Sequence, residues 1–118
     1  MTREEFNQLV GEALDSLPAE FRRRIENVAV LVEDRPAQPL PSEPGKPPRL
    51  LLGIFRGVRR TERSSFALPY GPNHIVLYQK NIEAVCHNDE EVRRQVRRTV
   101  IHEFGHYFGM TEKQLEGV

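Results

Sequence analysis

The chain contains very little cysteine, since Cys86 stands alone among 118 residues. A single cysteine cannot form an internal disulfide bond, and it excludes a zinc site built from four cysteines. The sequence also lacks the run of ~18 apolar residues that a transmembrane helix needs, and no apolar secretion-signal segment follows Met1. We therefore expect a cytoplasmic protein without membrane attachment.

The chain also lacks an excess of charge of either sign: its formal net charge is zero, because 17 basic residues balance 17 acidic ones. A neutral chain has no overall attraction to nucleic acid or to an anionic membrane, so we expect neither as a partner. Hydrophobic residues make up 38% and charged residues 29% of the sequence, which is typical of a folded globular protein. The length predicts a single domain over residues 1–118. No feature of the sequence specifies the oligomeric state.

The N-terminal part predicts two helices followed by a strand. Thr2 is placed to cap the first helix, with Glu5 at the capping-box position. Apolar residues then recur at helical spacing until Pro18, which ends this helix and begins a second one over residues 18–27. The β-branched run at residues 28–32 predicts a buried strand.

Proline dominates the next segment, residues 34–49, and favours an extended loop over a helix. This loop is either a plain surface crossing or a flap over a functional site. Two further strands are predicted at residues 50–55 and 74–79, and a helical turn at residues 80–86.

The longest helix is predicted to start after the cap residue Asn88, with Glu91 as its capping-box partner. It continues to the neighbourhood of Phe108, where Gly109 supplies a stop. Some twenty residues span ~30 Å, about the width of the domain, so this helix should be central. We interpret its arginines as a solvated, charge-balanced face and not as a nucleic-acid site: Arg93, Arg94, Arg97 and Arg98.

The residues that suggest chemistry lie late in this helix, as His102-Glu103-Phe104-Gly105-His106. Histidines at positions i and i+4 share one helix face, so His102 and His106 can bind one Zn²⁺. Glu103 lies ~100° around the helix from His102, where it can act as the general base toward zinc-bound water. The alternative is two surface histidines on an amphipathic helix.

A catalytic zinc site usually has a third protein ligand, and Glu112 is the best candidate. A left-handed Gly109 can reverse the chain and bring a residue three positions later back to the metal. Glu112 can also be read as an N-terminal carboxylate of a last short helix. The competing candidates for the third ligand are His74, Cys86, His87 and Asp89.

The complete string, H-E-x-x-H-x-x-G-x-x-E, resembles that of the minimal zincin-like metallopeptidases, a family of small bacterial proteins. The residues that carry the resemblance are His102, Glu103, His106, Gly109, Glu112 and the upstream run Ile75-Val76-Leu77-Tyr78. Family members commonly have aspartate where this chain has Glu112. The string also resembles the metzincin motif, which ends in histidine and is followed by a methionine turn that this chain lacks.

The resemblance implies an α+β, zincin-like fold with a small mixed sheet, a central metal-binding helix, N-terminal helices and zinc at the junction of helix and sheet. It implies peptide or protein substrates that pair along an edge strand, for which we expect residues 74–79. Four residues are candidates to stabilise the oxyanion of the reaction: Tyr70, His74, Tyr78 and Tyr107.

Two functional hypotheses follow from the sequence. The first is a zinc-dependent metallopeptidase that hydrolyses peptide bonds with a metal-activated water and Glu103 as general base. The second is a catalytically inactive, zinc-stabilised binding or regulatory module with the same fold. The small size favours the module, because a metal can supply folding free energy to a small core. The presence of Glu103 favours the enzyme, and hydrolysis of non-peptide bonds would use the same metal chemistry.

Overall fold

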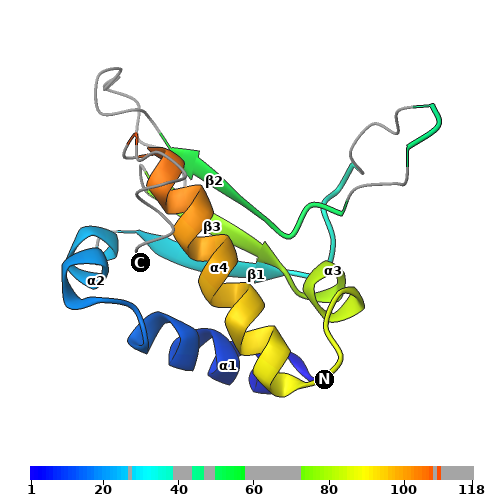
Figure 1. Ribbon diagram of the computed structural model, residues 1–118, viewed down its shortest axis with the longest axis horizontal. Coiled ribbons are helices and arrows are strands. Elements are labelled where there is room, and N and C mark those ends of the chain that lie inside the picture. Colours follow the sequence, from blue (N-terminus) through cyan, green and yellow to red (C-terminus); the bar gives the residue numbers. More distant parts are fainter. Residues whose placement is uncertain (27, 39–43, 47–49, 58–72, 108, 110–118) are drawn as a thin grey trace.

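The computed structural model describes residues 1–26, 28–38, 44–46, 50–57, 73–107 and 109. The class is α+β, as predicted, with helices packed on a small mixed sheet (Figure 1). The elements in chain order are α1 (Arg3–Asp15), α2 (Ala19–Ile25), β1 (Ala29–Glu33), β2 (Gly53–Gly57), β3 (Asn73–Tyr78), α3 (Gln79–Ala84) and α4 (Asp89–Tyr107). In the part of the chain that the structure describes, no helix has both the length and the apolar character needed to cross a membrane.

Local signals place the helix ends where the sequence predicts them. The hydroxyl of Thr2 accepts a hydrogen bond from the backbone N–H of Glu5 at 3.1 Å, which caps α1. The amide oxygen of Asn88 accepts from the N–H of Glu91 at 2.9 Å and caps α4 in the same way. Gly109 has a φ of +70°, the left-handed conformation expected just after a helix.

The sheet has the strand order β1-β3-β2, with β3 parallel to β1 and antiparallel to β2. The expectation that residues 74–79 form an edge strand is therefore wrong, since β3 is the central strand of the three. Residues of β3 from His74 to Tyr78 are buried on both faces. Burial of both faces favours apolar residues at successive positions of a strand, and the run Ile75-Val76-Leu77 has this character.

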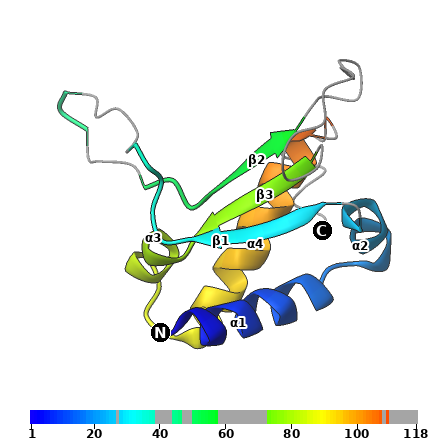
Figure 2. The same cartoon turned by 180° about the vertical axis from the view of Figure 1, so that it is seen from behind.

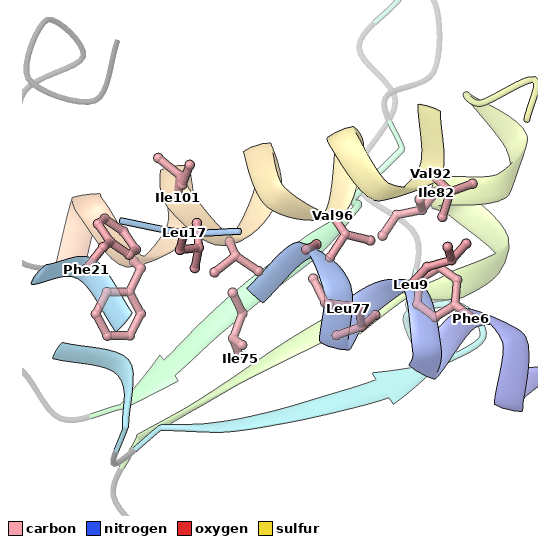
Figure 3. Close-up of a cluster of buried hydrophobic side chains, with 14 residues drawn as sticks. Phe6, Leu9, Leu17, Phe21, Ile75, Leu77, Ile82, Val92, Val96 and Ile101 are labelled. Atoms are coloured by element: carbon pink, nitrogen blue, oxygen red, sulfur yellow. The ribbon is translucent and has the colours of Figure 1, made fainter. Parts of the chain in front are cut away.

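Helices α1, α2 and α4 all lie on one face of the sheet, and the view from behind shows the three strands in front of α4 (Figure 2). The hydrophobic core fills the space between these helices and the sheet (Figure 3). Phe104 of α4 is its aromatic centre, with 1% of its surface exposed. Its ring lies 5.6 Å from that of Phe21 and 5.7 Å, edge to face, from that of Phe55. This cluster joins α2, α4 and β2 immediately beside the candidate site.

Candidate metal centre

Helix α4 carries the first two residues of the motif in its last turns. The side chains of His102 and Glu103 are both half-buried. The helix continues to Tyr107, so positions 102 and 106 lie one turn apart on one face of a regular helix. The side chain of His106 and the whole of Glu112 lie outside the described residues.

Glu103 makes a specific contact with the sheet that the sequence did not predict. Its Oε2 accepts a hydrogen bond from the backbone N–H of Phe55, with 3.2 Å between nitrogen and oxygen. The two residues are 48 positions apart in the chain, and no local pattern links them. The carboxylate of Glu103 therefore lies against β2, and not against the central strand.

The hydrogen-bond pattern of the sheet shows which edge of β2 this is. The N–H of Tyr78 donates to the carbonyl of Leu52 at 2.9 Å, and these residues lie opposite each other when the β2–β3 register is extended by one position. In an antiparallel pair, such bonded positions alternate with positions whose N–H groups point away from the partner strand. Phe55 is three positions after Leu52, so its N–H points away from β3. Glu103 thus lies at the outer edge of β2, which no other described strand occupies.

Three of the four competing ligands are too far from His102 to share a metal with it. Asp89 is the first residue of α4, thirteen residues before His102, which corresponds to about 20 Å along the helix axis. Cys86 and His87 precede Asp89 at the same end of the helix. A single metal ion binds atoms about 2–2.3 Å away, so none of these residues can complete a site at His102.

The fourth competitor, His74, lies on the wrong face of the sheet. Successive residues of a strand point to opposite faces, and the neighbouring Ile75 belongs to the core beneath α4. His74 therefore faces away from α4. Tyr78 shares that face, so neither residue is positioned to stabilise an oxyanion beside Glu103. The other two candidates for that role, Tyr70 and the side chain of Tyr107, lie outside the described residues.

The thiol of Cys86 is expected to have low reactivity, and it is also far from His102. Burial raises the pKa of its thiol, and the nearby negative charge of Glu91 raises it further. We predict that Cys86 is alkylated slowly by iodoacetamide at neutral pH and at the same rate with and without zinc, as followed by mass spectrometry. Protection of Cys86 by zinc would show that the thiolate is a ligand after all.

The donor atoms in this part of α4 fit zinc. Imidazole nitrogens are preferred ligands of catalytic zinc, and Glu103 is an additional carboxylate beside the first of them. Among the described residues alone, no group of three or more histidine, cysteine, aspartate or glutamate side chains forms a metal site. The described part contains only one of the three predicted ligand side chains, that of His102.

Comparison with known proteins identifies the family. The model of the zincin-like metallopeptidase family matches residues 25–118, which include every element from β1 onward. The chain therefore belongs to the zincin-like metallopeptidase family, as its motif predicted, and zinc is the cofactor that this family implies in general. A search of curated proteins finds no match. Among solved structures, the chain is similar to a conserved hypothetical protein from T. thermophilus, at 25% sequence identity and a TM-score of 0.56, over 92% of this chain and 94% of that one.

Proposed function

We propose that this chain is a zinc-dependent peptidase in which His102, His106 and Glu112 hold the metal and Glu103 is the general base. The observation that carries the proposal is the position of Glu103, beside a half-buried histidine and hydrogen-bonded to the outer edge of β2. An acid–base group at the edge of a strand lies where an extended peptide can pair with the protein backbone.

The residues of the chain supply two functions in this reaction. Along β2, the outward main-chain groups of alternate residues, including those of Gly53 and the carbonyl of Phe55, can pair with an extended peptide, while the N–H of Phe55 binds Glu103. Bound zinc would polarise the scissile carbonyl and lower the pKa of a coordinated water. The Glu103 carboxylate would accept a proton from the attacking water and return it to the leaving amine nitrogen.

A second candidate function is a zinc-stabilised binding or regulatory module without hydrolysis. The same hydrogen bond favours it, because the Glu103 carboxylate ties α4 to β2 and so has a structural use without catalysis. The two functions differ in what the zinc-loaded protein does to peptides, and not in whether zinc binds.

The first test combines metal content with peptide hydrolysis. We predict about one zinc per chain in the wild type and none in His102→Ala, measured by elemental analysis after zinc loading and removal of free metal. His87→Ala is the matched control, since it removes an exposed histidine at the far end of α4 and should retain zinc.

The same proteins are then incubated with a peptide library, and the products are identified by mass spectrometry. Cleavage by the wild type and by His87→Ala, but not by His102→Ala, supports the peptidase. Zinc binding without cleavage of any peptide favours the binding module. Full zinc content in His102→Ala would refute the metal site itself.

A further inference from the structure

We propose that Gly53 is a positioning residue for the general base: the absence of a side chain there lets α4 approach β2 closely enough for Glu103 to bind the N–H of Phe55. The catalytic part of this inference rests on the proposed function. The structural part, which concerns the spacing of α4 and β2, does not.

The space around Gly53 leaves no room for a side chain. A Cβ atom at this position would lie 2.7 Å from Cγ2 of Thr99, a distance that real Cβ atoms essentially never show. It would also lie 3.1 Å from the carbonyl oxygen of Val76. Backbone conformation is not the reason for glycine here, because Gly53 does not have a positive φ, unlike Gly45 and Gly109. The requirement at Gly53 is the close approach of its neighbours, and the closest of them is Thr99 of the helix.

Thr99 is held firmly on the helix side of this contact. It is buried, with 8% of its surface exposed, and its hydroxyl accepts a hydrogen bond from Nε2 of Gln95 at 3.2 Å. A buried, β-branched threonine with this hydrogen bond moves less easily than the end of a long, flexible side chain. Any added bulk at Gly53 must therefore move the helix or the strand.

The contact between Gly53 and Thr99 and the contact between Phe55 and Glu103 follow each other along both β2 and α4. Thr99 and Glu103 are one helical turn apart, about 6 Å along α4, and their partners on β2 are two residues apart, about 6.6 Å along the strand. The two contacts therefore act as a pair, and the spacing set at the first determines the reach of Glu103 at the second.

The hydrogen bond between Phe55 and Glu103 tolerates little further separation of α4 and β2. The distance from the nitrogen of Phe55 to Oε2 of Glu103 is 3.2 Å, already at the long end of the N–H···O range of about 2.7–3.2 Å. Relief of a 2.7 Å contact to the 3.4 Å at which ordinary contact begins requires about 0.7 Å of movement. A shift of that size away from β2 would lengthen this contact beyond hydrogen-bonding range as long as the Glu103 side chain keeps its present conformation.

The test is the substitution Gly53→Ala. We expect kcat for peptide hydrolysis to fall roughly 10- to 100-fold with a smaller change in KM, because a misplacement near 1 Å can cost ~10²-fold in rate. We also expect faster hydrogen exchange at the Phe55 amide, measured by NMR, because its acceptor has moved away. Gly11→Ala is the matched control, since nothing lies within 4 Å of a Cβ at this exposed position of α1. It should leave both readouts at wild-type values.

A compensating substitution separates positioning from general damage. Thr99→Ser removes Cγ2, the tightest of the contacts, and keeps the hydroxyl that accepts from Gln95. The double variant Gly53→Ala/Thr99→Ser should therefore recover part of the kcat and part of the Phe55 protection. Should Gly53→Ala fail to fold, this double variant carries the test alone. A folded double variant without Phe55 protection, or one that also fails to fold, would overturn the proposal.

Two failures can be told apart with these variants. Absence of peptide hydrolysis in the zinc-loaded wild type contradicts the proposed function, while the Phe55 exchange rates still test the positioning. Unchanged exchange and unchanged kcat in Gly53→Ala, with an active wild type, would contradict the role of Gly53 and leave the peptidase intact.

Discussion

Replacement of Glu103 by glutamine is expected to lower kcat for peptide hydrolysis by about 10²- to 10⁴-fold, the usual contribution of a general base, with metal content unchanged. Glutamine has the size of glutamate and keeps a side-chain oxygen that can accept from the N–H of Phe55. It cannot accept a proton from water at neutral pH. The variant therefore separates the proposed catalytic role of Glu103 from its structural contact with β2.

Steady-state kinetics on a peptide identified by the library screen, beside zinc analysis of the same samples, is the measurement. Glu90→Gln is the matched control, because it removes one negative charge from an exposed position near the start of α4, where Glu90 pairs with Arg93 and Arg94. Its kcat should equal that of the wild type. Equal activity of Glu103→Gln and the wild type would exclude Glu103 as the base and leave it as a tie between helix and strand.

Replacement of Phe104 by alanine is expected to lower the free energy of unfolding by about 3–5 kcal/mol, the usual cost of truncating a buried phenylalanine. Phe104 is 1% exposed and contacts the rings of Phe21 and Phe55. Its removal leaves a cavity where α2, α4 and β2 meet. Since a domain of this size is stable by only about 5–15 kcal/mol, the loss would bring the protein near its unfolding limit.

Equilibrium unfolding in urea, followed by circular dichroism, measures this loss. Val85→Ala is the control, because 48% of the Val85 surface is exposed, and its effect should stay within about 0.5 kcal/mol. A loss below about 1 kcal/mol for Phe104→Ala would show that the Phe104 cluster does not hold these elements together.

The sequence alone was sufficient wherever a structure depends on residues close together in the chain. The caps at Thr2 and Asn88 and the left-handed Gly109 were predicted and confirmed, because a cap forms between a residue and the backbone about three positions away. The candidate centre was found for the same reason, since the spacing of His102 and His106 becomes a shared helix face as soon as α4 forms.

The sequence left the third ligand open among several residues, and only the fold reduces that set. His87 stands fifteen positions before His102, close enough in sequence to be considered, yet a straight helix separates them by more than about 20 Å. His74 is excluded because successive residues of β3 point to opposite faces of the sheet, and the face of His74 is the one away from α4. Glu112 lies outside the described residues and remains the predicted third ligand.

The order of the strands in the sheet could not be predicted from the sequence, because strand pairing depends on which segments meet in space. We expected residues 74–79 to form an edge strand, whereas β3 is hydrogen-bonded on both sides, to β1 and to β2. The contacts that position Glu103 are of the same kind: Thr99 meets Gly53, and Glu103 meets Phe55, across more than forty residues of chain. Local chemistry therefore determined helix α4 and its histidine motif, and tertiary packing decided which strand this helix faces, because close approach between distant segments leaves no periodic or local pattern in the sequence.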